Sequence, residues 1–184
     1  VDDLKTHTEE EVFNLVEKRW KGLALLRKNL GDKNIGFQQN KGFELFQELD
    51  FFDTCNSRKK EINQLLNPIF KTDVFSISDN KFHFKKVYHK YSVNNFEGQI
   101  DTGKMTAQLL LKVQKLGVKI LNNIAVESFI ENRESVIVKT DKTEIKTNKL
   151  LIATNGFANQ LLQEEVKPAR AQVIITKPIK NLQI

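Results

Sequence analysis

The order of predicted elements between Met105 and Gly156 constrains the fold of this chain more than any other feature. Apolar residues at helical spacing fill the start of this stretch, and Gly117 follows them as a helix stop signal. The apolar segment 118–121 comes directly afterwards and predicts a strand. A helix that runs straight into a strand is typical of one half of an α/β layer.

A meander of short strands is predicted next. Segments 124–130, 134–140 and 144–147 have strand-like composition, and short polar turns separate them. After the last of them the chain is expected to re-enter the buried layer at Leu150.

The segment 150–153 predicts a second strand of that layer, because four apolar residues in a row suit a strand covered on both faces. In α/β sheets, ligands bind at the carboxyl ends of strands. Thr154, Asn155 and Gly156 follow at this end, where small residues let backbone approach a ligand and polar ones offer hydrogen bonds. A glycine after a strand is also common in plain turns, so both interpretations stay open.

A long helix is predicted from about Thr8 to Leu30. Thr8 and Glu11 have the spacing of a capping box, and Gly31 ends the helix. Trp20 lies on its apolar stripe and is predicted to pack in the core rather than to stack on a cofactor.

The region between this helix and Glu97 predicts an α+β arrangement. We expect a strand pair or a bulged strand at 35–46 and a polar break at 50–57. A short helix from Ser57 to about Leu66 should end before Pro68. Strands at 74–77 and 81–91 are predicted to pair in an antiparallel sheet. Asp101 or Thr102 should cap the helix that contains Met105, and Glu97 and Gln99 flank a glycine in a loop where a binding role is open.

The net charge of +6 raises the question of an anionic partner. The densest basic run, at 81–86, alternates like an edge strand on which lysines discourage further pairing, which favours a solvated edge over nucleic-acid binding.

The single cysteine, Cys55, favours a reducing compartment, and hence the cytoplasm. No apolar run has the length of a membrane span. The three histidines lack partners at metal-ligand spacing, and no nucleophile has a base beside it, so we predict neither a metal site nor a catalytic residue.

Four strings in the second half of the chain have the order and spacing of a known family. They read GVKILNNIAVESFI, VIVKT, KLLIATNGFANQLL and PARAQVIITKPI. In this order they resemble the second half of the FAD-binding region of FAD-dependent oxidoreductases of the D-amino-acid-oxidase type, to which glycine oxidase and sarcosine oxidase are similar here. The resemblance is clearest from Glu97 to Ile179 and extends more loosely over most of the chain.

The resemblance implies a mixed fold of the α+β and α/β classes. It consists of a substrate-side antiparallel sheet with helices, and of part of a Rossmann-like FAD-binding layer with its β-meander. Residues 1–96 would be the substrate-side region and residues 97–165 the partial FAD-binding region. Residues 166–184 would return as a strand to the substrate domain.

The resemblance also implies cofactor-binding residues. Val126 matches the residue whose backbone meets the adenine end of FAD, although its position in a strand pattern would by itself indicate an ordinary strand residue. Ala153, Thr154 and Gly156 match the segment that passes close to the dinucleotide. The family more usually has glycine where Asn155 stands. Arg170, at the start of a predicted last strand, is expected to form a surface ion pair and is not predicted to be catalytic.

The family's Gly-x-Gly-x-x-Gly turn for the pyrophosphate is absent from the sequence. The chain is therefore expected to be an internal piece of a flavoenzyme that oxidises an amine or amino acid, inactive alone, with an incomplete FAD site and with exposed core through which it could dimerise. Two other hypotheses remain: a non-catalytic module for protein interaction, which an exposed apolar patch would indicate, and a basic nucleic-acid binder.

Overall fold

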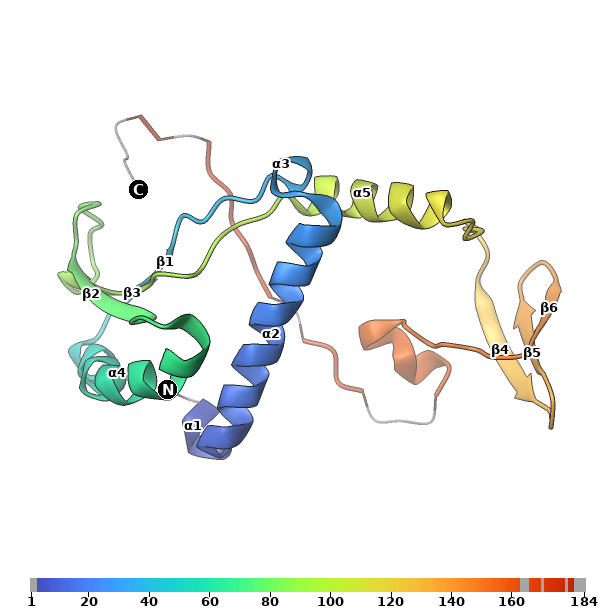
Figure 1. Ribbon diagram of the computed structural model, residues 1–184, viewed down its shortest axis with the longest axis horizontal. Coiled ribbons are helices and arrows are strands. Elements are labelled where there is room, and N and C mark those ends of the chain that lie inside the picture. Colours follow the sequence, from blue (N-terminus) through green and yellow to red (C-terminus); the bar gives the residue numbers. More distant parts are fainter. Residues whose placement is uncertain (1–2, 163–165, 170, 178, 181–184) are drawn as a thin grey trace. The chain divides into compact units, whose positions relative to one another are not determined.

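The computed structural model describes residues 3–162, 166–169, 171–177 and 179–180 (Figure 1). The chain divides into two compact units. Unit 1 contains the residues up to Gly117, and unit 2 extends from Val118 to Lys180. Each unit is described by itself.

Unit 1 begins with the helices α1 (Asp3–Thr6) and α2 (Glu9–Leu30). The predicted capping box is confirmed, since the Thr8 hydroxyl accepts the Glu11 N–H while the Glu11 carboxylate accepts the Thr8 N–H. Gly31 ends α2 with a φ of 83°, a backbone conformation that favours glycine. The prediction for Trp20 is also confirmed, because its ring packs on those of Phe70 and Phe96 at centroid distances of 4.9 and 5.7 Å.

The region 35–46, predicted as a strand pair or a bulged strand, contains a single strand. The short helix α3 (Asp32–Ile35) ends at a fully buried isoleucine, and the strand β1 (Gly42–Leu45) follows after a loop. Within this loop, Gln38 forms an isolated antiparallel bridge with Gln99.

The helix α4 (Leu49–Phe70) has 22 residues, about twice the length of the predicted helix from Ser57 to Leu66, because it covers both the predicted polar break and Pro68. The prediction was wrong at both ends. Pro68 lies in the last turn, where it removes one hydrogen bond, to the carbonyl of Gln64, and that residue is exposed to water. The polar residues before Ser57 lie on exposed turns of the helix, so their polarity did not mark a loop.

The strands β2 (Phe75–Asp79) and β3 (Lys90–Asn94) pair antiparallel, and β1 lies on the other side of β3, giving the order β1-β3-β2. The antiparallel sheet was predicted, but residues 81–89 form a loop rather than a strand edge. The Asn80 side chain shapes this loop, since its amide donates to the Phe84 carbonyl at 2.8 Å and its oxygen accepts the Phe84 N–H at 3.1 Å. Such local bonds compete with strand formation.

Asn63 joins α4 to the sheet. Its side chain is 5% exposed, and it donates to the Phe75 carbonyl and accepts the Phe75 N–H, both at 2.8 Å. Because β2 is an edge strand, these two backbone groups face away from β3 and find their partner in Asn63.

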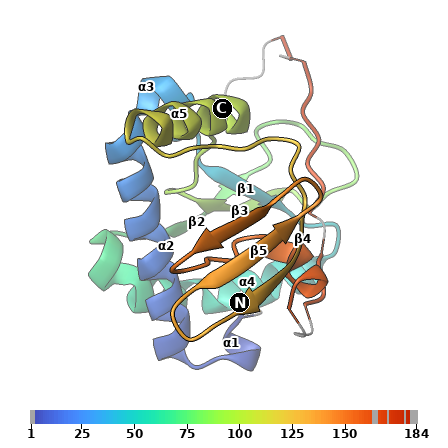
Figure 2. The same cartoon turned by 90° about the vertical axis from the view of Figure 1, so that its right-hand side faces the viewer.

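The helix α5 (Thr102–Lys115) has Asp101 as its N-cap, one of the two residues predicted for this role. The Asp101 carboxylate accepts the Lys104 N–H at 2.9 Å, and this bond holds the pKa of Asp101 below its ordinary value. The N-terminal part of α5 lies beside α3 (Figures 1 and 2), and the Lys112 ammonium bonds Asn29 on α2 at 3.3 Å. No helix among the described residues is long and apolar enough to cross a bilayer.

Unit 2 contains the predicted meander. The strands β4 (Val126–Glu131), β5 (Val136–Thr140) and β6 (Glu144–Thr147) pair antiparallel in this order (Figure 1). Asp141, in the β5–β6 turn, fixes the start of β4, since its carboxylate accepts the Ala125 N–H at 3.0 Å and its own N–H donates to the Ala125 carbonyl at 3.0 Å.

Three predicted strands of unit 2 are not strands in the structure. Segments 118–121, 150–153 and 171–176 have no strand partner among the described residues, and Leu151 is 88% exposed. A strand requires a neighbour for its backbone groups, and the apolar pattern says nothing about where that neighbour is. The six-residue 3₁₀ helix η1 (Asn155–Gln160) follows the second of these segments. Arg170 lies outside the described residues.

Candidate functional site

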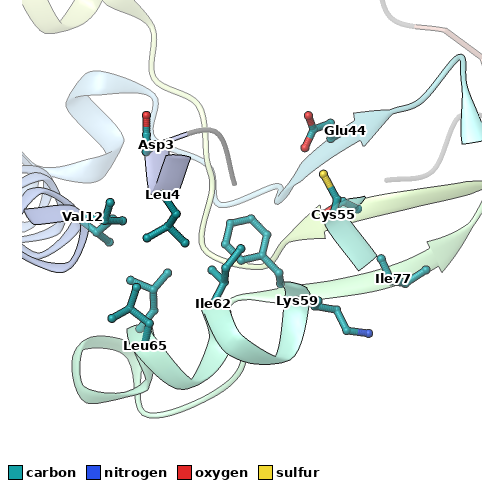
Figure 3. Close-up of a pocket in the computed structure, with 13 residues that line it drawn as sticks. Asp3, Leu4, Val12, Glu44, Cys55, Lys59, Ile62, Leu65 and Ile77 are labelled. Carbon is teal, nitrogen blue, oxygen red and sulfur yellow. The ribbon is translucent and has the colours of Figure 1, made fainter. Parts of the chain in front are cut away.

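Unit 1 contains a cavity of about 250 Å³ between its sheet and its helices, which is partly open to solvent (Figure 3). It is lined by α1, α2, α4 and all three strands of the sheet, through residues Asp3, Leu4, Val12, Val16, Glu44, Cys55, Lys59, Ile62, Leu65, Leu66, Phe75, Ile77 and Ser92. Most of these side chains are apolar. The polar groups among them are few, as in typical small-molecule pockets.

The polar lining of the cavity comes partly from one row of the sheet. Glu44, Ser92 and Ile77 are direct neighbours on β1, β3 and β2, so they share one face. Ser92 is 9% exposed, and its hydroxyl forms no hydrogen bond with another described residue. In Figure 3 the carboxylates of Asp3 and Glu44 both lie on the upper side of the view, whereas the ammonium of Lys59 points away from them.

A second hollow of about 320 Å³ extends along the same face towards Glu97. A side chain at Gly42 would displace the Glu97 carboxylate, because a Cβ at this position would overlap an Oε atom of Glu97. Gln99 has a structural role, since its side-chain amide donates to Gln38 Oε1 at 2.9 Å beside the backbone bridge. Glu97 lines this hollow, so a binding role for it remains a prediction. The side chain of Gln99 instead holds the loop to Gln38.

The predicted cofactor residue Val126 begins β4 in unit 2. It pairs with Thr140, and a β-bulge separates this pair from that of Ser128. Its side chain is 41% exposed. Bulges occur where a strand turns away from regular pairing, often beside functional sites, so the position is compatible with an accessible backbone at this end of β4.

The other predicted cofactor residues lie at the start of η1. Ala153 and Thr154 are exposed, and Asn155 has a φ of 49°, in the left-handed region that glycine and asparagine tolerate best. This explains physically why Asn155 can stand where glycine is more usual. Gly156 is half-buried, and a Cβ there would lie 2.9 Å from Cβ of Pro168.

The exposed Thr154 and Asn155 could contact part of a dinucleotide, but the residues around them do not enclose one. Thr154 lies in the bridge region and Asn155 in the left-handed region, and neither N–H donates a hydrogen bond to another described residue, so both remain available to an acceptor. However, Pro168 fills the space at Gly156, and Ala153, Thr154 and Asn155 are exposed rather than enclosed. Among the described residues, no group of three potential metal ligands gathers at any position.

A family model described as FAD dependent oxidoreductase (DAO) matches residues 3–184, nearly the whole chain. The chain belongs to this family. Membership confirms the interpretation drawn from the four strings, and it makes FAD the cofactor of the proteins to which this chain is related.

Two solved structures are similar to this member of the DAO family. One is L-proline dehydrogenase from P. horikoshii, with a TM-score of 0.61, 22% identity and coverage of 79% of this chain and 39% of the other. The second is NikD, described as an unusual amino acid oxidase essential for nikkomycin biosynthesis, with a TM-score of 0.62, 17% identity and coverage of 85% and 40%. The chain thus spans about two fifths of each structure. No curated protein sequence matches significantly.

These likenesses confirm the predicted fold class, a mixture of helices and antiparallel sheet as in the FAD-binding family fold. The cofactor roles of Val126, Ala153, Thr154 and Gly156 remain predictions. Sequence reasoning missed the cavity of unit 1, because its lining is spread over residues 3–92 and has no local motif.

Proposed function

We propose that this chain is part of a flavoenzyme that oxidises an amine or an amino acid. The observation that carries the proposal is the match of the DAO family model over residues 3–184. When bound in such an enzyme, FAD accepts a hydride from the carbon that bears the amine, and the protein supplies binding and orientation.

The substrate class follows from the named structural neighbours. One is a dehydrogenase of L-proline and the other an amino acid oxidase, so both act on amino acids. Because the identities are 22% and 17%, the likeness itself concerns the fold, and the extension to this chain is part of the proposal.

We assign the roles by position in the family. Residues 1–96 would form the substrate side, 97–165 part of the FAD side, and 166–184 the return to the substrate side. This division differs from the boundary of the compact units, because it follows the family's function and not the packing. The chain alone would be inactive, since its sequence lacks the glycine-rich pyrophosphate turn, and Val126 and Thr154 are both exposed to solvent.

A second candidate function is protein interaction without catalysis. It is favoured by apolar side chains of unit 2 that are almost fully exposed, including Leu151 at 88%, Val173 at 81% and Ile174 at 90%. Patches of this kind mark interfaces. In the flavoenzyme proposal the same side chains would be covered by the rest of the enzyme, and in isolation they would favour dimers.

We further propose a cytoplasmic location, in keeping with a single cysteine.

Visible absorption tests the proposal. The protein expressed from the complete reading frame should show a flavin spectrum, while the 184-residue chain mixed with FAD should show none bound after gel filtration. In the complete protein, Gly156→Val should lower the flavin content, because the new side chain would collide with Pro168 and displace the turn that carries Thr154. Gly22→Ala is the matched control, since a Cβ there meets nothing within 4 Å.

The two candidate functions give different results. A complete protein without flavin, even after reconstitution with FAD, would refute the oxidoreductase and favour the interaction module. A flavin spectrum in the complete protein that Gly156→Val leaves unchanged would keep the enzyme but remove the cofactor role of this turn.

A further inference from the structure

The loop that joins β2 to β3 concentrates positive charge. Four lysines and one aspartate lie between Asp79 and Lys90, so this short segment carries half of the chain's net charge of +6. The sequence explained its lysines as a means to keep an edge strand from further pairing. Because residues 81–89 form a loop and not an edge strand, the charge needs another explanation.

The base of this loop is ordered by specific contacts. The Asn80 side chain bonds the backbone of Phe84 at 2.8 and 3.1 Å, and the Tyr91 hydroxyl donates to the same Asn80 oxygen. The Phe82 ring is stacked on that of Tyr91, with a centroid distance of 5.8 Å, and packs edge-on against Phe43 at 5.0 Å. A partner that binds this loop would therefore lose little affinity to ordering of its backbone.

Three consecutive residues of the loop, Phe84, Lys85 and Lys86, are not explained by packing. The Lys81 ammonium lies over the ring of Phe82 at 5.0 Å and so has a structural role. Phe84 is 44% exposed, and both Lys85 and Lys86 are exposed and form no ion pair with a described residue. We call these three residues the loop tip. The loop extends beyond the ends of β2 and β3 (Figure 1).

The loop tip has the chemistry of a group that binds an anionic lipid surface. An aromatic ring can enter the boundary between headgroups and acyl chains, while lysine side chains beside it keep their ammonium groups among the lipid phosphates. A single projecting loop can reach a flat surface in this way. A nucleic acid would instead require basic groups spread along a face that follows its backbone.

We infer that the loop tip binds the surface of an anionic membrane. The ring of Phe84 inserts, and Lys85 and Lys86 bind lipid phosphates. Each lysine near such a surface strengthens binding about fivefold, so we expect an affinity no higher than the roughly 10⁴ M⁻¹ of a single myristoyl chain. The binding is therefore peripheral and reversible. It goes beyond the proposed function and involves no redox step.

Co-sedimentation of the 184-residue chain with vesicles at low ionic strength tests the inference. One set of vesicles contains phosphatidylglycerol and phosphatidylcholine in equal parts, and the other contains phosphatidylcholine alone. The neutral vesicles report any adsorption through exposed apolar side chains of unit 2, such as Leu151, which requires no lipid charge. Binding to the anionic vesicles should be at least about tenfold stronger, and salt at about 0.15 M should weaken it.

Charge substitutions locate the contact. The double variant Lys85→Gln, Lys86→Gln should weaken binding to anionic vesicles about ten- to thirtyfold. Lys142→Gln with Lys146→Gln in unit 2 is the matched control, because it removes the same charge from other exposed positions and should change binding less than about twofold.

Phe84→Ala tests insertion of the ring. It should weaken binding to anionic vesicles about three- to tenfold, because the buried aromatic area is lost. The bonds from Asn80 go to the backbone of Phe84, so the loop keeps its shape in this variant. Urea denaturation followed by the fluorescence of Trp20 should give the wild-type midpoint for every unit 1 variant.

Four results would overturn the inference. They are equal binding to anionic and neutral vesicles, equal losses in the tip and control lysine pairs, wild-type binding in Phe84→Ala, and tighter binding of a DNA duplex that the tip lysine substitutions abolish. The last result would assign the tip to nucleic acid. None of these measurements depends on flavin, so a failure here is distinguishable from a failure of the proposed oxidoreductase activity.

Discussion

Replacement of Asn63 by alanine should destabilise unit 1 by about 2–4 kcal/mol. Two hydrogen bonds of 2.8 Å are lost, and each contributes about 0.5–1.5 kcal/mol net. The Phe75 N–H and carbonyl also lose their partner at a place where the Asn63 side chain is 5% exposed. An unsatisfied buried group costs about 1–3 kcal/mol, and water entering the new space would recover part of that cost.

The assay is urea denaturation followed by the fluorescence of Trp20, the one tryptophan of the sequence. Trp20 packs on Phe70 at the end of α4, so its signal reports on unit 1 and not on the meander. Gln64→Ala is the matched control. It lies one residue along the same helix on the exposed side and should change stability by less than about 0.5 kcal/mol.

Asn63→Asp separates the two hydrogen bonds. An ionised carboxylate would still accept the Phe75 N–H but would face the Phe75 carbonyl without a proton to donate. Its pKa in the folded state should therefore be raised above its value in the unfolded chain. A raised pKa gives stability that is present at low pH and lost as the pH rises through the folded pKa, so this variant should weaken between about pH 4 and 7, while the wild-type asparagine does not titrate. A loss below about 1 kcal/mol in Asn63→Ala, or a pH-independent Asn63→Asp, would refute the reasoning.

Further predictions concern glycines and a helix cap. Gly22→Ala should raise thermal stability by about 0.5–1 kcal/mol, because it lies inside α2 and a Cβ there meets nothing within 4 Å. Gly98→Ala should lower stability by about 1–3 kcal/mol, because its Cβ would lie 2.6 Å from the Gln38 carbonyl oxygen; equal melting temperatures of the two variants would contradict the packing described. The cap of α5 should weaken as the pH falls below the ordinary Asp101 pKa of 3.8, because a lowered folded pKa gives stability that protonation removes. Hydrogen exchange of the Lys104 amide measures this, and Asp101→Asn should make that exchange insensitive to the acid change.

The sequence was sufficient to predict features in which a residue forms hydrogen bonds with its near neighbours in the chain. The capping box of Thr8 and Glu11, the stop at Gly31 and the cap at Asp101 were all predicted, because each depends on hydrogen bonds within a few residues. The meander was predicted for a similar reason, since tight turns bring its strands together and Val138 at its centre is buried.

The missed features depend on residues far apart in the chain. The polar residues at 50–57 indicated a break, although they lie on exposed turns of α4. The role of Asn63 was missed because it depends on β2, which presents the backbone of Phe75 to it. The apolar segments 118–121 and 150–153 indicated buried strands, yet a strand also needs a partner that the pattern does not identify. The cavity combines Asp3, Glu44 and Ser92 from separate elements, so no window of sequence contains it.

The placement of β3 between β1 and β2 has a consequence for folding during synthesis. Asn63 and Phe75 are twelve residues apart, so α4 and β2 can associate soon after they leave the ribosome. β1 is made earlier, but its partner β3 follows more than forty residues later, after a loop closure that is slow relative to local contacts. Until then the β1 backbone and its side chains Phe43 and Leu45 remain unpaired. This interval is when a nascent chain is most exposed to aggregation, and a chaperone that binds short apolar segments would be expected to recognise β1 first.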